Sequence, residues 1–215
     1  MVLYGSSMSP YVRKVLAYAG EKGIALESRP VGLRDENPEF RAASPLGKMP
    51  ALVDGDYSLA DSSAIIHYLE AKYPDRPLIP AEPEARGRVI WWEEFADTML
   101  MGCLQKMFFN RVVAPMFLKR EGNAELADAA ERDELPPLLR YLEEQVPEEG
   151  FLVSDGLSLA DLAVASPLAN LPLMGSEIDS SRFPRLAAYL QRILSRASFA
   201  GLLAKERAFM QRFAA

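Results

Sequence analysis

Residues 2–23 read VLYGSSMSPYVRKVLAYAGEKG, and this stretch predicts a short strand, a loop and a helix in quick succession. Residues 2–4 are apolar and are followed by glycine, which is typical of a strand and its end. Pro10 suits the first turn of a helix, where its missing N–H costs no hydrogen bond. We expect that helix to reach about Lys22, which leaves Ser9 at its N-terminus.

The segments that follow extend this unit to the order β-α-β and then β-β-α. Residues 26–31 predict a second strand. Two further strands, 51–53 and 57–59, flank Asp54-Gly55-Asp56, a typical hairpin turn. Asp61 or Ser62 should then cap a helix that runs through Tyr73.

Residues 73–83 carry a proline at every third position, which favours extended backbone and predicts a linker. Only helices are expected beyond it. The first should span about 84–109, and the second about 125–146 with a break or kink at Pro136-Pro137, because an interior proline costs ~3 kcal/mol.

A capping pattern, Ser158-Leu159-Ala160-Asp161, predicts the start of a buried helix that reaches about Leu171. Two more helices are expected at about 184–196 and 198–212.

The composition excludes several classes of protein. The chain has 49% hydrophobic and 25% charged residues and a net charge of −6, with no basic stripe of the kind that binds nucleic acid. One cysteine and one histidine allow neither an intrachain disulfide nor a Cys/His zinc site. No apolar stretch reaches the ~18 residues of a membrane span, and no signal peptide is recognisable, so we expect a cytoplasmic protein.

Three short motifs point to binding of a charged small molecule. Ser9 should stand among the free N–H groups at a helix N-terminus, which stabilise an anion such as a thiolate. Pro50, just before a strand, indicates a turn with a possible cis bond that leaves the Met49 backbone free for a ligand. Asp61-Ser62 offers a carboxylate and a second helix N-terminus.

These motifs resemble those of the cytosolic glutathione transferases along essentially the whole chain. Residues 9–23 are similar to the first βα unit of the serine-type classes, with tau- and zeta-like spacing. Residues 44–52 resemble the cis-proline loop of the family. The resemblance implies a thioredoxin-like N-terminal domain at 1–78, a Pro-rich linker at 79–83 and an all-helical domain at 84–215 that carries the electrophile pocket.

The resemblance also implies a role for each motif. Ser9 would donate a hydrogen bond to the glutathione sulfur and favour the thiolate. The Met49 backbone, next to Pro50, would pair with the cysteinyl part of glutathione, and Lys48 would meet the glycyl carboxylate. Asp61 would receive the γ-glutamyl ammonium, while Ser62 would hold the γ-glutamyl carboxylate.

Further candidates follow from the same resemblance. Tyr11, Phe108 and Arg111 would line the electrophile pocket, and Asp97 would reach glutathione across the interface of a homodimer. Tyr4 stands near the position where tyrosine-type classes keep their catalytic hydroxyl, and Ser6 or Ser7 could share the thiol contact. Tyr4, Ser6 and Ser7 are therefore alternatives or helpers to a single expected catalytic residue, Ser9.

The expected activity is conjugation of glutathione, as co-substrate and without a metal, to small apolar electrophiles, as in detoxification. Two rivals stay open. A glutathione-dependent isomerase, dehalogenase or etherase would use the same thiolate with a different apolar pocket. A non-catalytic binding or regulatory protein of the same fold would need neither Ser9 nor the other motifs.

Overall fold

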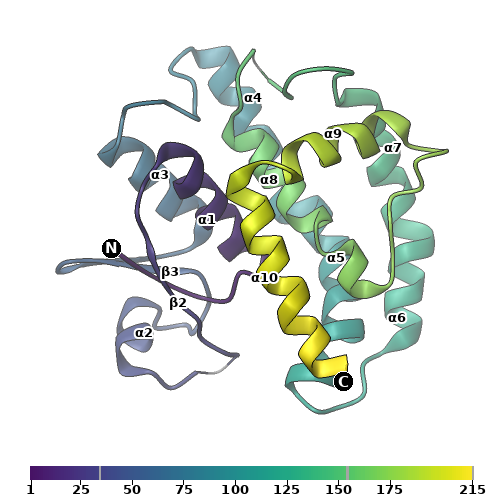
Figure 1. Ribbon diagram of the computed structural model, residues 1–215, viewed down its shortest axis with the longest axis horizontal. Helices are drawn as coiled ribbons and strands as arrows, with labels where there is room; N and C mark the ends of the chain where they lie inside the picture. Colours follow the sequence, from purple (N-terminus) through teal and green to yellow (C-terminus); the bar gives the residue numbers. More distant parts are fainter. Residues whose placement is uncertain (34, 154, 215) are drawn as a thin grey trace.

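The structure, a computed structural model, describes residues 1–33, 35–153 and 155–214. In Figure 1 the small sheet and its helices α1–α3 form the left part of the molecule, and a larger group of helices forms the right part. The first part contains β1 (Val2–Tyr4), α1 (Pro10–Lys22), β2 (Glu27–Arg29), α2 (Pro38–Ala43), β3 (Ala51–Asp54), β4 (Tyr57–Ala60) and α3 (Ser62–Lys72). Its mixed sheet has the strand order β2-β1-β3-β4, as expected for a thioredoxin-like fold.

The sheet is covered differently on its two faces. Leu3 and Leu52 are fully buried in the main core together with Val12 of α1 and Ile65 of α3. Because successive strand residues point to opposite faces, Tyr4 belongs to a second, smaller core, which it shares with Phe40 of α2 and Ala51. Helices α1 and α3 therefore pack on one face and α2 on the other.

Strand register brings three loops to one edge of the sheet. Tyr4 pairs with Ala51 in the antiparallel β1–β3 ladder, and Ala51 pairs with Ala60 in the β3–β4 ladder. The residues just after β1, just before β3 and just after β4 therefore leave the sheet side by side. These three adjacent loops position the residues of the candidate site.

The short helix α2 was missed, since no helix or strand was predicted between residues 32 and 50. Its signal is local: Asn37 caps the helix by accepting hydrogen bonds from Glu39 N (2.9 Å) and Phe40 N (3.1 Å), and Pro38 occupies the first turn. Both are standard helix-start residues. Strand β2 is also shorter than the predicted 26–31.

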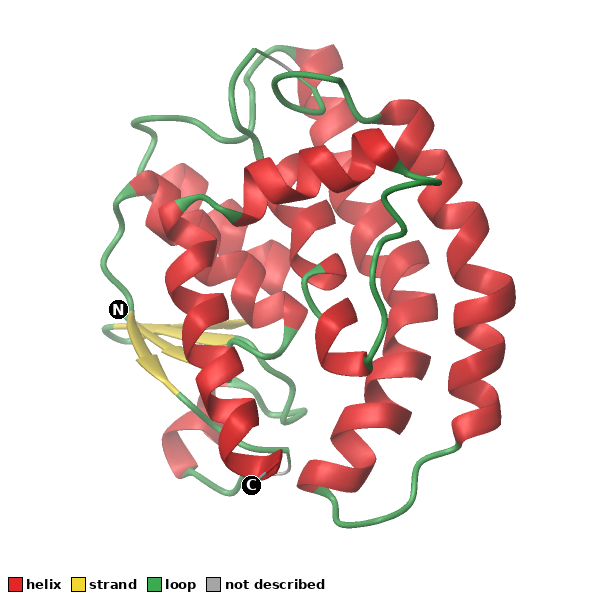
Figure 2. Ribbon diagram, turned by 45° about the vertical axis from the view of Figure 1, so that its right-hand side comes forward, coloured by secondary structure: helices red, strands yellow, loops and turns green. Residues whose placement is uncertain are grey.

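The remainder of the described chain is helical (Figure 2). The π and 3-10 segments are labelled η. The elements are α4 (Pro83–Glu94), η1 (Phe95–Leu100), α5 (Met101–Phe108), η2 (Phe109–Phe117), α6 (Ala124–Ala129), η3 (Ala130–Glu134), α7 (Leu135–Gln145), α8 (Leu159–Leu168), η4 (Leu171–Met174), α9 (Pro184–Leu194) and α10 (Ala197–Ala214).

Pro115 and Pro136 lie in or just after a π-helical segment. The helix predicted to end near Phe109 continues to Phe117 as the π-helical η2, which contains Pro115. The break expected at Pro136 takes the form of the π-helical η3, after which Pro136 falls in the first turn of α7. There its missing N–H removes no helical hydrogen bond.

Helix α8 is the centre of the helical part, and it contacts both α1 and α4. Every residue from Leu159 to Leu168 is buried, as the uncharged sequence predicts. The predicted capping pattern is confirmed: the Asp161 carboxylate accepts from Ser158 N at 2.9 Å. Among the described residues, no helix has the length and apolar character that crossing a bilayer requires.

Candidate functional site

Ser9 is the N-cap residue of α1, with φ −72° and ψ 124°. Its N–H donates to Ser6 O at 2.9 Å, and its carbonyl accepts from Arg13 N at 2.9 Å. Its side chain makes no capping hydrogen bond to the helix. Ser9 therefore does not cap the helix with its side chain, which is the usual role of a serine at this position. The hydroxyl of this half-buried residue can donate to another acceptor.

Met49-Pro50 lies beside this loop and has a cis peptide bond. The preceding turn is fixed by the buried Ser44, whose hydroxyl accepts from Lys48 N at 2.9 Å and donates to Lys48 O at 2.7 Å. The Lys48 side chain is exposed. Within the described residues, the Met49 N–H and carbonyl have no backbone partner, so both could bind an extended peptide.

Asp61 follows β4 and caps α3 in an unusual backbone conformation, with φ 83° and ψ 132°. Its carboxylate accepts from Ser63 N at 2.9 Å and from Ala64 N at 3.1 Å. A non-glycine residue held at positive φ costs about 1–3 kcal/mol, and such residues cluster at functional sites. Next to it, Ser62 is almost fully buried and begins the helix.

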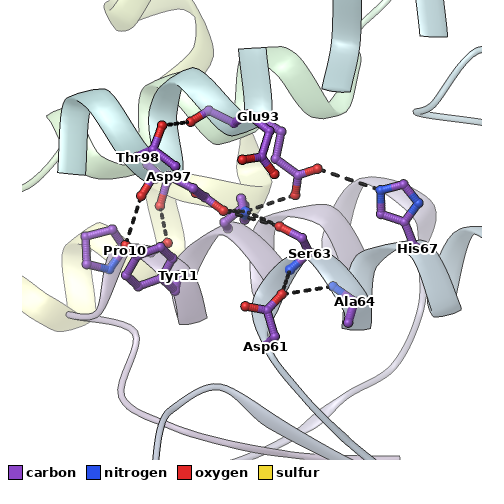
Figure 3. Close-up of polar contacts among 12 residues, drawn as sticks. Pro10, Tyr11, Asp61, Ser63, Ala64, His67, Glu93, Asp97 and Thr98 are labelled. Carbon is purple, nitrogen blue, oxygen red and sulfur yellow. Dashed lines mark hydrogen bonds and ion pairs between the residues drawn. The ribbon is translucent and has the colours of Figure 1, made fainter. Parts of the chain in front are cut away.

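Asp97 of η1 lies close to the N-terminus of α3 within the same subunit. Its carboxylate accepts from Ser63 Oγ at 3.3 Å and from Lys14 Nζ at 2.5 Å, so Ser63 lies between Asp61 and Asp97 (Figure 3). Lys14, which is 1% exposed, also pairs with Glu93 at 3.0 Å. Burial raises the pKa of Asp97, and the Lys14 charge opposes this.

Tyr11 joins the same cluster from α1. Its hydroxyl donates to the Asp97 carbonyl at 3.2 Å. Burial, together with the negative charges of Asp97 and Asp61, raises the pKa of Tyr11 to about 12. The phenol therefore stays protonated at neutral pH and acts as a donor between α1 and η1.

These elements match two family models in the expected order. The model described as "Glutathione S-transferase, N-terminal domain" matches residues 3–77, and the one described as "Glutathione S-transferase, C-terminal domain" matches residues 104–197. The mouse protein named glutathione S-transferase theta-3 is 34% identical over 197 residues, which are 89% of this chain and 80% of that protein. The chain belongs to the glutathione S-transferase family.

Two other similarities add detail. A structure titled glutathione S-transferase-I bound with lactoylglutathione has a TM-score of 0.82 and 26% identity, and the match covers 94% of this chain and 98% of that one. A Coxiella burnetii protein named stringent starvation protein A homolog is 27% identical over 95% of this chain and 92% of its own length. The predicted family and its two-part fold are confirmed, whereas the tau- or zeta-like class is not, since a theta-class relative is among the matches.

Tyr4, the alternative hydroxyl in this transferase, lies on the opposite face of the sheet from α1. It donates to Glu39 Oε2 at 2.5 Å and accepts from Arg29 at 3.2 Å. Burial and the hydrogen bond to Glu39 raise the pKa of Tyr4. Ser6 Oγ accepts from Met8 N at 3.4 Å. The Tyr4 hydroxyl is thus already engaged with partners on the α2 side.

The predicted pocket residues of the helical part have unequal surroundings. Phe108, at the end of α5, is half-buried and packs against the main core. Arg111 in η2 pairs with Asp128 at 2.7 Å and with Glu131 at 2.6 Å, so its guanidinium already has two carboxylate partners. In the described residues, no group of three His, Cys, Asp or Glu side chains could hold a metal ion.

Lys14 and Ser63 were missed as site residues in the sequence. Ser63 had a readable signal, since it directly follows Asp61-Ser62 at a helix start. Lys14 had none, because a lysine on a surface helix is normally solvated and only the packing of α1 against α4 and η1 buries it.

Proposed function

We propose that this protein is a glutathione transferase that activates glutathione as a thiolate through Ser9 and conjugates it to small apolar electrophiles. The proposal rests on one observation: Ser9 occupies the N-cap position of α1, but its hydroxyl makes no capping hydrogen bond to the helix. In the sheet, Tyr4 at the end of β1 pairs with Ala51 at the start of β3, so the loop that leads to Ser9 lies at the same edge as Met49, which precedes β3.

The thiolate would be stabilised by two effects. The Ser9 hydroxyl would donate a hydrogen bond to sulfur, which favours the charged form over the thiol. The N-terminus of α1 adds the positive end of a helix dipole, which also favours an anion. The thiolate then attacks an electrophilic carbon of the second substrate, and the leaving group departs with the electron pair of the broken bond.

The remaining motifs would bind the peptide part of glutathione. The Met49 N–H and carbonyl would pair with the cysteinyl residue, and the exposed Lys48 would meet the glycyl carboxylate. Asp61 would take the γ-glutamyl ammonium. Ser62 would offer its hydroxyl and its own N–H to the γ-glutamyl carboxylate, because the Asp61 cap already occupies the N–H groups of Ser63 and Ala64.

The second substrate would lie between Ser9 and the helical part, with Tyr11 and Phe108 as pocket residues. Arg111 is the least supported member of the predicted set, because Asp128 and Glu131 already hold its guanidinium. We keep the boundaries 1–78, 79–83 and 84–215 for the glutathione-binding domain, the linker and the helical domain, and a cytoplasmic location for the whole.

We also propose a homodimer. Its support is the exposure of large apolar side chains: Trp91 of α4 and Met99 of η1 are each 50% exposed, and Tyr57 of β4 is 46% exposed. Asp97 has partners within its own subunit, and its predicted reach across the interface would use the 19% of its side chain that is exposed. Glutathione would then contact both subunits.

The rival functions predict different measurements. An isomerase, dehalogenase or etherase of this fold would also lower the thiol pKa of glutathione and would differ only in the electrophile it accepts. A non-catalytic role is the second candidate, since one of the matched relatives is named a stringent starvation protein A homolog and not a transferase. A non-catalytic protein would not lower that pKa.

The test is the thiolate absorbance of glutathione bound to the wild-type protein, recorded against pH. We expect a thiol pKa well below the free value of ~8.5, together with conjugation of an activated aryl halide. Glutathione bound at an unshifted pKa, or not bound, would contradict the proposal and favour the non-catalytic candidate.

Replacing Asp61 with alanine should weaken glutathione binding about 10-fold or more, because a charge-assisted hydrogen bond contributes about 1.5–3 kcal/mol. The thiol pKa of the glutathione that still binds should stay low, since Ser9 is unchanged. Isothermal calorimetry and the pH titration measure the two effects separately. Asp56→Ala, on the turn between β3 and β4, is the surface control.

Replacing Tyr4 with phenylalanine should leave the bound thiol pKa unchanged within ~0.3 units, because the lost hydroxyl bonds to Glu39 and Arg29 rather than to a ligand. We expect instead a loss of ~1 kcal/mol in unfolding free energy from the broken hydrogen bonds. A pKa rise as large as that of Ser9→Ala would identify Tyr4 as the thiol donor.

A further inference from the structure

Arg13 of α1 is fully buried and makes four hydrogen bonds across the molecule. Its guanidinium donates to both oxygens of Glu206 on α10, at 3.1 and 2.5 Å. It also donates to the Ser166 carbonyl at 2.7 Å and to Asn170 Oδ1 at 2.6 Å. None of these groups belongs to the proposed glutathione site, so the cluster needs another explanation.

Two side chains of this cluster donate hydrogen bonds to the backbone carbonyls of the residues on either side of Ser9. Asn170 Nδ2 donates to the Met8 carbonyl at 3.1 Å, and Ser166 Oγ donates to the Pro10 carbonyl at 2.7 Å. The residues before and after the proposed thiol donor are therefore each held by one side chain from α8 or the turn that follows it. A general interdomain contact would not have to choose these two carbonyls.

Arg13 fixes how both side chains are aimed. An arginine has only donors, so the Asn170 atom that faces it must be the amide oxygen, and the amide nitrogen then points to Met8. The Ser166 carbonyl is bound by the same guanidinium, which holds the backbone from which the hydroxyl reaches Pro10. The planar fork of arginine thus sets two donors at once.

Glu206 supplies the charge that lets Arg13 be buried. A buried guanidinium without a counter-charge is strongly unfavourable, and Glu206 is only 3% exposed. Glu206 lies on α10, which packs along α1 (Figure 1). The last helix of the chain is therefore joined to the Ser9 loop through one continuous set of hydrogen bonds.

We propose that Arg13, Ser166 and Asn170 are positioning residues that hold the Ser9 hydroxyl toward the glutathione sulfur, and that Glu206 makes this dependent on α10. This inference rests on the proposed role of Ser9. A hydroxyl on a loop aims correctly only if its backbone is fixed, and a displacement of 1 Å costs up to ~10²-fold in rate.

The direct test removes the two donors singly and together, as Ser166→Ala and Asn170→Ala. One neutral hydrogen bond contributes about 0.5–1.5 kcal/mol. We therefore expect each variant to raise the thiol pKa of bound glutathione by ~0.5 units and to lower kcat several-fold at neutral pH. KM for glutathione should stay within ~2-fold of wild type, because Lys48, Met49 and Asp61 are untouched.

The matched control is Glu21→Gln, at the other end of α1. Glu21 accepts from Arg196 at 2.7 and 2.8 Å and from Ser198 at 2.6 Å, so it also joins α1 to the α10 region. It lies far along the helix from Ser9. This variant should lower the melting temperature without changing the thiol pKa or kcat.

Glu206→Gln tests the link to α10, because it keeps most of the shape and removes the charge. We expect it to raise the thiol pKa in the same direction as Asn170→Ala. Ser166→Thr keeps a hydroxyl, so the thiol pKa should be close to the wild-type value and below that of Ser166→Ala. This comparison tests the positioning role even if Asn170→Ala or Glu206→Gln does not fold.

The outcomes separate the two proposals. If wild-type protein lowers the thiol pKa, Ser9→Ala raises it, and Ser166→Ala matches Glu21→Gln in changing stability alone, the positioning role is wrong and the role of Ser9 stands. If wild-type protein does not lower the pKa at all, both are wrong. A pKa rise in Ser166→Ala and Asn170→Ala, absent in Glu21→Gln, supports the positioning role.

Discussion

Replacing Ser9 with alanine should raise the thiol pKa of bound glutathione by about one to two units and lower kcat at neutral pH by ~10- to 100-fold. The reason is the size of one hydrogen bond to a charged acceptor, about 1.5–3 kcal/mol. One pKa unit corresponds to 1.36 kcal/mol. The fold already provides the helix N-terminus, so the variant keeps part of the stabilisation and does not return fully to the free thiol value of ~8.5.

The loss should depend on pH in a defined direction. At pH values below the thiol pKa of the variant, most bound glutathione is protonated and the deficit is largest. Above that pKa the thiolate forms without help, so the variant and wild type should converge as pH rises. The measurement is kcat between about pH 6 and 9, paired with the absorbance titration of the bound thiol.

Two substitutions sharpen the Ser9 result. Ser9→Thr keeps a hydroxyl and should retain part of the decrease in the thiol pKa. Ser6→Ala removes a neighbouring hydroxyl that accepts from Met8 N, and it should leave the thiol pKa unchanged. The glutathione affinity of Ser9→Ala should change little, because other residues are proposed to bind the peptide part. A deficit that stays constant from pH 6 to 9 would assign Ser9 a structural role instead.

Local signals in the sequence predicted most of the fold that positions this site. Ser9 and Pro10 start a helix, and Gly23 ends it in the left-handed conformation, with φ 71°. Each is a property of one or two residues, so no tertiary contact is needed to recognise it. The hairpin and the capping pattern at Ser158 were readable in the same way.

The elements that were missed or altered depend on packing. The π turns η2 and η3 begin at Phe109 and Ala130, where no residue type marks a change of helical pitch in advance. They form where Pro115 and Pro136 must be accommodated within packed helices. The sequence therefore indicates that a helix is disturbed and leaves the form of the disturbance open.

The same limit applies to the residues around Ser9. Arg13 and Lys14 look like solvated residues of an amphipathic helix, yet both are almost fully buried. Their partners, Glu206 and Glu93, are 193 and 79 positions away in the chain. Side chains that contact each other over such separations leave no periodic pattern in the sequence. Local motifs therefore suggested the proposed ligands of glutathione, whereas no motif indicated the buried residues behind them.

Replacing Asp161 with alanine should be the most destabilising single change considered for this protein, with a loss of about 3–5 kcal/mol in unfolding free energy. The carboxylate is fully buried and accepts from Ser158 N at 2.9 Å, Ser158 Oγ at 3.0 Å, Leu152 N at 2.9 Å and Tyr189 Oη at 2.7 Å. Each buried donor left without a partner costs about 1–3 kcal/mol.

The effect should extend to the proposed site around Ser9 because α8 begins at this cap. The same helix carries Ser166, which holds the Pro10 carbonyl next to Ser9. Fraying of its first turn should loosen the contact between the two parts of the chain before either part unfolds. A chain of this size loses about 2–4 °C in Tm per kcal/mol, so we expect Asp161→Ala to melt roughly 8–15 °C lower.

Asp179→Ala is the control that distinguishes the effect of burial from the effect of losing hydrogen bonds. Asp179 also accepts from a serine, with Ser181 N at 2.9 Å and Ser181 Oγ at 2.6 Å, but it is exposed, so water replaces the lost acceptor. Its removal should cost less than ~1 kcal/mol. If denaturation of Asp161→Ala and Asp179→Ala gave equal losses, the buried cap would contribute no more than a surface turn, and α8 would owe its stability to its apolar packing alone.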